Sequence, residues 1–143
     1  MSELEVLSSA AAAFPPRTVR GQALPHLLFF TDPQRVPNPE AIAERLPAGA
    51  GIVYRAFSAE DAIERGRRLR VIATERGLLL LVGAHPGLAE GVRADGLHMP
   101  ERLSAEIPRL RAEHSRWLIT VAAHDRGALR AAERVGADAV VVS

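Results

Sequence analysis

Five side chains with acid–base or ionic chemistry lie at the ends of short apolar runs in this sequence. They are Asp32, Arg55, His85, His98 and His124. An imidazole exchanges protons near neutral pH, and a guanidinium binds the oxygens of carboxylates and phosphates. If the apolar runs are neighbouring parallel strands, their carboxyl ends meet at one edge, so these five groups are candidates for a single functional site.

The elements that would position these groups recur along the chain. In two copies, Leu88–Met99 and Ala131–Ser143, a helical stretch reaches a small residue, an Ala-Asp pair and then an apolar run. This alternation of helix and apolar strand is typical of a parallel β/α protein. The predicted strands are His26–Asp32, Gly51–Phe57, Leu78–Ala84, Asp95–Met99, Trp117–Ala123 and Ala137–Ser143.

The pattern predicts an α/β fold, a parallel (β/α) barrel of the TIM type that is incomplete, with about six βα strands. A closed barrel of this type has eight strands and roughly 200 residues or more. We therefore expect a partial barrel over residues 26–143. Residues 1–25 are expected to form a short N-terminal helix, Glu3–Phe14, which two prolines end, and a linker from Arg17 to Pro25.

Helices are expected between the strands, with boundaries set by capping residues. Pro39 at a first helical position begins a helix to Leu46. Ser58 is a good N-cap for a helix that runs to about Arg76. Ser104 and Asp125 are expected to cap two later helices in the same way.

Each candidate site residue also has a purely structural interpretation. Asp32 precedes a proline and can cap its own loop, and Arg55 can extend along a strand face to solvent. His85 precedes a proline in a loop, His98 can be a hydrogen-bonded core residue, and His124 can support the start of a helix. The convergence of all five on one edge favours the functional interpretation for the group as a whole.

Charge and composition exclude several kinds of site. All 18 basic side chains are arginine, so no lysine can form a Schiff base or hold a phosphate. No cysteine is present, which excludes disulfides, thiolate catalysis and zinc–thiolate sites. The net charge of +1 argues against nucleic acid as the main partner. The start lacks a basic signal-peptide region and no stretch is long and apolar enough for a membrane span, so we expect a cytoplasmic protein.

Motifs for metals and nucleotides are weak in this sequence. The histidines lie on separate predicted strands and form no HxxxH or HxH pair, so we expect no metal site from them. No GxxxxGK phosphate loop is present. The glycines of Gly49–Gly51 precede a strand, whereas those of a dinucleotide fingerprint follow one.

The order and spacing of these segments resemble the thiamine phosphate synthase/TenI family from about Leu24 onward. LLFFTD is similar to the family's first strand, which ends in Thr-Asp, and GIVYRAF lies where the family has Gln-x-Arg-x-Lys. ADGLHMPE is similar to Ala-Asp-Gly-Val-His-Leu-Gly-Gln, and ITVAAHD to Gly-x-Ser-x-His-Ser. LLLLVGAHPGLA corresponds to a segment with Ile-Asn-Asp-Arg, and GADAVVVS to a strand that precedes a Pro-Val-Phe loop.

The resemblance implies a TIM-type barrel and a protein of thiamine biosynthesis. The family synthase is a transferase that couples hydroxymethylpyrimidine diphosphate to thiazole phosphate, with magnesium on the diphosphate that leaves. Of the residue types this reaction uses, Arg55, His98 and His124 remain. The expected magnesium-binding Asp falls near Arg102 or Leu103, so magnesium is expected only if the chain is a divergent synthase.

TenI-type relatives instead tautomerise a thiazole carboxylate phosphate, and a histidine at the position of His124 transfers the proton. The resemblance thus gives His124 and His98 catalytic roles, and Asp32, Arg55 and His85 roles in binding a small phosphorylated thiazole or pyrimidine. Three alternatives stay open at this point. The chain is a divergent synthase, a tautomerase, or a non-catalytic relative that binds a ligand or a partner.

The sixth predicted strand is also the last segment of the sequence. An open sheet has bare strand edges, which pair readily with other chains. We therefore expect a homodimer through an open strand edge or the helix faces beside it, and no nucleic-acid or membrane partner. A fragment of a longer reading frame is the remaining alternative.

Overall fold

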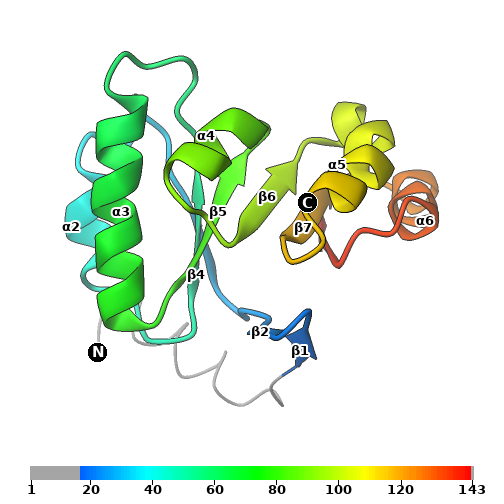
Figure 1. Cartoon of the computed structure of the whole chain (residues 1–143), viewed down its shortest axis with the longest axis horizontal. Helices are drawn as coiled ribbons and strands as arrows, with labels where there is room; N and C mark the ends of the chain where they lie inside the picture. Colours follow the sequence, from blue (N-terminus) through cyan, green and yellow to red (C-terminus); the bar gives the residue numbers. More distant parts are fainter. Residues whose placement is uncertain (1–16, 143) are drawn as a thin grey trace.

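The computed structural model describes residues 17–142 and is built on one parallel sheet of six strands in sequential order. Every neighbouring pair is parallel, which confirms the predicted β/α architecture. The sheet curls into part of a TIM-type barrel (Figure 1). The strands are β3 Leu28–Phe30, β4 Gly51–Tyr54, β5 Leu79–Gly83, β6 Gly96–Met99, β7 Leu118–Ala123 and β8 Ala139–Val142.

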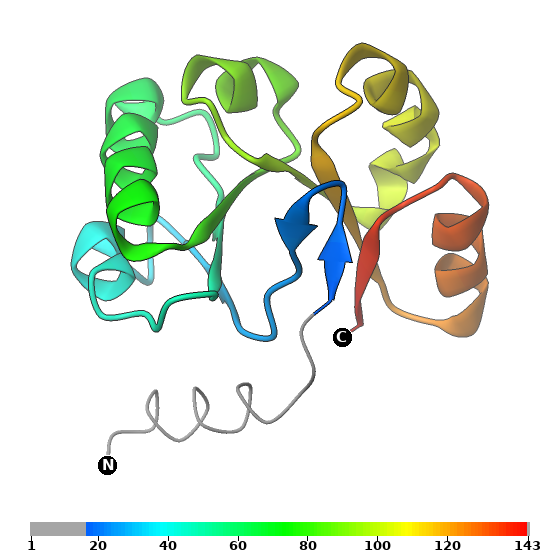
Figure 2. The ribbon, with the colours of Figure 1, turned by 60° about the horizontal axis from the view of Figure 1, so that its bottom comes forward.

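Helices connect successive strands and cover the outer, convex face of the curled sheet (Figure 2). Within the described residues, no helix has both the length and the apolar character needed to cross a lipid bilayer. The helices are α2 Pro39–Ala43, α3 Ala62–Arg76, α4 Pro86–Gly91, α5 Ile107–Glu113 and α6 Arg126–Arg134, and a 3₁₀ helix, η1 Glu101–Glu106, precedes α5. The predicted helix Glu3–Phe14 lies outside the described residues.

Capping explains where several helices begin. Asp125 accepts the Ala128 backbone N–H at 2.7 Å and begins α6, as predicted. The predicted N-cap at Ser58 is wrong, because α3 begins four residues later, after Asp61. The backbone at Ser58 has φ 63°, a left-handed conformation that an N-cap residue does not adopt. Ser104 is not an N-cap either, because it lies inside η1.

Alternation along the strands divides the core into two layers. Side chains such as Ile52, Leu80 and Leu97 face outward and pack under the helices. On the inner, concave face, a smaller apolar cluster fills the barrel interior toward the amino ends of the strands. It is formed by Val53, Leu79, Leu81 and Leu118. Both faces of the central strands are therefore apolar, as in parallel sheets that are covered on both sides.

A hairpin closes the amino-terminal side of this interior. Strands β1 Thr18–Val19 and β2 Gln22–Ala23 pair antiparallel and lie on the inner side of the sheet (Figure 2). Gln22 Nε2 donates to the backbone carbonyls of Asp95 and Arg116 at 3.2 and 3.3 Å. The segment interpreted as a linker is thus a packed hairpin. Its two turn residues have positive φ, which matches a type I′ turn and its usual glycine.

The recurring Ala-Asp pair has a structural role that is the same in both copies. Asp95 Oδ2 accepts the Leu80 N–H at 2.8 Å, and Asp138 Oδ2 accepts the Ile119 N–H at 2.8 Å. Each carboxylate thereby ties its own strand to the second residue of the preceding strand. Arg70 and Arg111 pair with the two carboxylates, at Asp95 and Asp138 respectively. The repeat fixes strand register at the amino ends.

Asp138 is the stronger of the two ties, because its side chain is only 5% exposed and pairs with both Arg20 and Arg111. We expect Asp138→Ala to lower the free energy of unfolding by about 2–4 kcal/mol, because two guanidiniums and a buried N–H lose their acceptor. Urea denaturation measures this change. Asp61→Asn is the matched control, since the Asp61 side chain forms no capping hydrogen bond. Equal stabilities of the two variants would contradict the assigned role.

Candidate functional site

An open cavity of about 690 Å³ lies where the carboxyl ends of the strands meet on the inner face. This volume suits a small organic ligand. Toward the amino ends of these strands, the inner apolar cluster fills the barrel interior. The cavity is therefore open only on the carboxyl-terminal side. The lining residues are Phe30, Arg55, Ala56, Phe57, Ser58, Gly83, Ala84, His85, Leu88, His98, Pro100, Arg102, Ala122, His124 and Val141.

Arg55 is the most firmly held ionic group of the cavity. Its Nε donates to the Thr31 backbone carbonyl at 2.8 Å, and its backbone N–H donates to Thr31 Oγ1 at 2.9 Å. The guanidinium carbon lies 5.5 Å from the ring centres of both Phe30 and Phe57. Within the described residues, Arg55 forms no ion pair with a carboxylate. Its charge is therefore fixed in place and available to an anionic ligand.

Gly83 on the neighbouring strand makes room for this arginine. A Cβ atom at Gly83 would lie 3.0 Å from Arg55 Cγ, closer than ordinary van der Waals contact. The resemblance places an Asn-Asp pair at this glycine and the following Ala84. A larger residue at either position would change the cavity wall beside the guanidinium.

His98 faces the cavity from β6 and is a buried residue with a fixed ring. Its Nδ1 lies 2.8 Å from Thr120 Oγ1, and the Phe30 ring contacts it edge-on with centroids 5.1 Å apart. Burial, and then the positive charge of Arg55, lower the pKa of His98 to about 4. His98 is therefore neutral at physiological pH and can offer a hydrogen bond to a ligand without adding charge.

His124 and His85 border the same cavity from two different loops. The His124 side chain is 60% exposed, and its Nε2 lies 3.9 Å from Glu101 Oε2. His85 is the N-cap of α4, and its Nδ1 accepts the Leu88 N–H at 3.3 Å. Because Nδ1 accepts this bond, the proton of neutral His85 is on Nε2, which can donate to a ligand.

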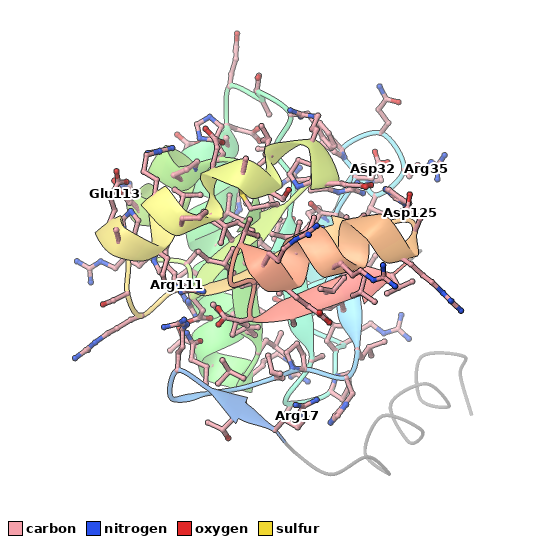
Figure 3. The ribbon with its side chains drawn as sticks, turned by 90° about the vertical axis from the view of Figure 1, so that its right-hand side faces the viewer. Arg17, Asp32, Arg35, Arg111, Glu113 and Asp125 are labelled. Atoms are coloured by element: carbon pink, nitrogen blue, oxygen red, sulfur yellow. The ribbon has the colours of Figure 1, made fainter. Side chains whose placement is uncertain are left out.

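Asp32 is the one sequence-predicted site residue that the structure leaves out of this cavity. Its carboxylate accepts the backbone N–H groups of Gln34 and Arg35 at 2.9 and 3.3 Å, as a loop cap does. The hydrogen bond from Gln34 is the main reason why the pKa of Asp32 is lowered. Asp32 lines a smaller adjoining hollow with Phe57, at the same end of the molecule as Asp125 (Figure 3).

Among the other cavity residues, Phe30, Phe57 and Arg102 carry an aromatic ring or a charge, and the sequence-based site included none of the three. Phe30 was detectable, because it alternates with the outward Phe29 on a strand that ends beside the candidates. Phe57 was harder to detect from the sequence, because it lies in a loop, has φ 49° and is 68% exposed. Phe57, Ser58 and Ala84 all have positive φ and all line the cavity. Such backbone strain in residues other than glycine is concentrated at functional sites. The third residue is Arg102, on η1.

The family of the chain follows from comparison with known proteins. Residues 27–143 match the family model for thiamine monophosphate synthase (TMP-TENI). The chain belongs to this family. No curated protein matches the chain in sequence.

A solved relative shows the same fold. Thiamine phosphate pyrophosphorylase from Pyrococcus furiosus superposes with a TM-score of 0.69 at 22% sequence identity. The similarity covers 82% of this chain and 59% of that protein, so this chain spans somewhat more than half of its length. The likeness confirms the incomplete TIM-type barrel.

The donor set of this thiamine monophosphate synthase relative does not fit magnesium. Magnesium is held mainly by carboxylate and phosphate oxygens. None of the residues that line the cavity is an Asp or a Glu. Within residues 17–142, no group of three or more His, Cys, Asp or Glu side chains is arranged to hold a metal ion.

The depressed pKa of His98 predicts acid sensitivity. An unfolded histidine takes up a proton below about pH 6.5, whereas folded His98 resists protonation to about 4. Because the unfolded chain then binds more protons, stability falls as the pH drops through this window. This group alone costs about 2 kcal/mol between pH 7 and pH 5.

Urea denaturation of the wild type and His98→Asn at the two pH values measures this contribution. We expect the variant to lose less stability on acidification than the wild type. An equal loss in both proteins would show that His98 is not held neutral.

Proposed function

We propose that the cavity binds a phosphorylated thiazole and that His124 transfers a proton on it, as in a TenI-like tautomerase. The observation that carries this proposal is the ionic character of the lining. Its ionisable groups are arginines and histidines, and none is a carboxylate. A tautomerisation needs an anion site and a proton-transfer group, whereas diphosphate displacement needs a metal or an equivalent array of charge.

Arg55 is the phosphate-binding group in this proposal. Its guanidinium is fixed through Nε and lies 5.5 Å from the centres of two aromatic rings, and its remaining N–H groups can form paired bonds to phosphate oxygens. The fixed position lowers the entropy lost when the ligand binds. The neighbouring apolar lining, which includes Phe30 and Leu88, suits the flat ring of a thiazole.

His124 is the proton-transfer group. An imidazole has one nitrogen that accepts a proton and one that donates one, so it can remove a proton from one ring position and return one at another with no net loss of atoms. The nearby Glu101 carboxylate, 3.9 Å from Nε2, would stabilise the imidazolium that forms between the two steps. Neutral His98, fixed by Thr120, would orient the ligand by hydrogen bonding.

The synthase reaction is the second candidate, favoured by family membership and by the retained Arg55. It would require hydroxymethylpyrimidine diphosphate and thiazole phosphate to bind together. The carboxylates nearest the site are poorly suited to magnesium, because Asp32 is engaged by its own loop and Glu101 lies beside His124. The tautomerase is therefore the better match to this cavity than the synthase.

Isomerisation of thiazole carboxylate phosphate by the purified protein tests the proposal. We expect His124→Gln to lower kcat by about 10²–10⁴-fold and Arg55→Gln to raise KM by about tenfold or more. His114→Gln is the matched control, because His114 stacks on Trp117 and does not line the cavity. Magnesium-dependent formation of thiamine phosphate would favour the synthase, and ligand binding without either turnover would favour a non-catalytic relative.

We also propose that two copies associate through the exposed edge of β8. Val142 on this edge strand is 71% exposed, and an edge presents unpaired backbone donors and acceptors. Light scattering is expected to give a dimer for the wild type and a monomer for Val142→Lys, because lysine opposes edge pairing. Val71→Lys, at an exposed apolar position on α3, should remain dimeric. A monomer at all wild-type concentrations would rule this association out.

A further inference from the structure

We infer that Arg55 and Arg102 form a two-guanidinium clamp that binds a phosphate monoester dianion without a divalent metal. This inference rests on the proposed function, because it names how the same cavity holds its anionic ligand. The two arginines reach the cavity from different elements. Arg55 follows β4, and Arg102 is the second residue of η1, after β6.

Arg102 is available for a ligand. Its side chain is exposed and lines the cavity, and within the described residues it forms no hydrogen bond and no ion pair. The adjacent Glu101 lies near His124 Nε2, at 3.9 Å, and does not line the cavity. The 3₁₀ turn therefore separates the two opposite charges, with the cation toward the cavity.

Arg55 supplies the rigid half of the clamp. Its Nε–H is fixed on the Thr31 carbonyl, and the rings of Phe30 and Phe57 lie at 5.5 Å from its guanidinium carbon. Fixing Nε leaves the Nη groups as the ligand-binding edge. Arg102 supplies the mobile half, since an exposed arginine on a short turn can adjust to the position of the phosphate.

The charge of the lining decides against a bridging metal. Two permanent cations and no carboxylate repel a divalent ion, whereas each guanidinium can form paired bonds to phosphate oxygens. Neutral His98 adds no charge. Together, the arginines match the two negative charges of a phosphate monoester, and the apolar floor suits its ring. Magnesium would compete with the arginines for the phosphate oxygens.

Binding of phenyl phosphate, measured by calorimetry in EDTA and in excess magnesium, tests the clamp. We expect metal-free binding that excess magnesium does not strengthen. Arg102→Gln is expected to weaken binding about tenfold, and the double variant with Arg55→Gln to abolish it. Arg126→Gln is the matched control, because it removes the same charge from the start of α6, outside the cavity lining. It should bind as the wild type does.

The Arg102→Gln substitution is expected to leave the fold unchanged, because this side chain is exposed and forms no hydrogen bond or ion pair within the described residues. Loss of binding in EDTA, no binding by the wild type, or equal binding by Arg102→Gln and Arg126→Gln would each overturn the clamp. Thiazole turnover, measured on the same proteins, separates this result from the proposed function. If the protein binds phosphate but does not turn over the thiazole, the tautomerase proposal is wrong and the clamp stands. If Arg102→Gln leaves the turnover unchanged, the clamp is wrong and the tautomerase proposal stands.

Discussion

The site depends on one immobilised charge, the guanidinium of Arg55. The Thr31 hydroxyl and carbonyl hold its backbone and its Nε, and the rings of Phe30 and Phe57 lie 5.5 Å from its guanidinium carbon. Because its position is set by main-chain and aromatic contacts, the arginine needs no carboxylate partner. Its charge also contributes to keeping His98 neutral, after the larger effect of burial. One arginine therefore provides the anion site and adds to the effect of burial in keeping His98 neutral.

The distribution of charge along the strands complements this arrangement. The carboxylates of the repeated Ala-Asp pairs lie at the amino ends, where they hold backbone N–H groups and arginines. In Figure 3, Arg111 lies toward this side, away from Asp32 and Asp125. The carboxyl ends keep arginines and histidines around the cavity. Arginines thus serve two purposes: at the amino ends they pair with carboxylates that hold the strands together, and at the cavity they are available to a ligand.

Much of the architecture could be predicted from the sequence, because two periodicities determine it. Apolar runs alternate with helices, and the side chains within a run alternate between faces. These rules place Arg55, His98 and His124 at one edge, and the structure brings all three to one cavity. The Ala-Asp pairs were visible as a repeat. Their role in strand register required the hydrogen bonds to the preceding strand.

What could not be predicted depends on contacts that are distant in sequence or on loop conformation. The hairpin is held partly by Arg20 and Asp138, which are 118 positions apart, so no local pattern reveals it. Phe57 and Arg102 enter the cavity through a left-handed loop residue and a 3₁₀ turn, respectively. Asp32 is an ionisable residue at the carboxyl end of a strand, as a site residue would be. The loop that follows turns back, however, and the backbone N–H groups of Gln34 and Arg35 donate to its carboxylate.

A crystal structure of the protein grown with phenyl phosphate in the presence of EDTA tests the central claim most directly. The phosphate is expected in the cavity at the carboxyl ends of the strands, within hydrogen-bond distance of the Arg55 Nη atoms, with no metal ion between them. A phosphate bound elsewhere on the molecule, or an Arg55 side chain turned out of the cavity, would contradict it.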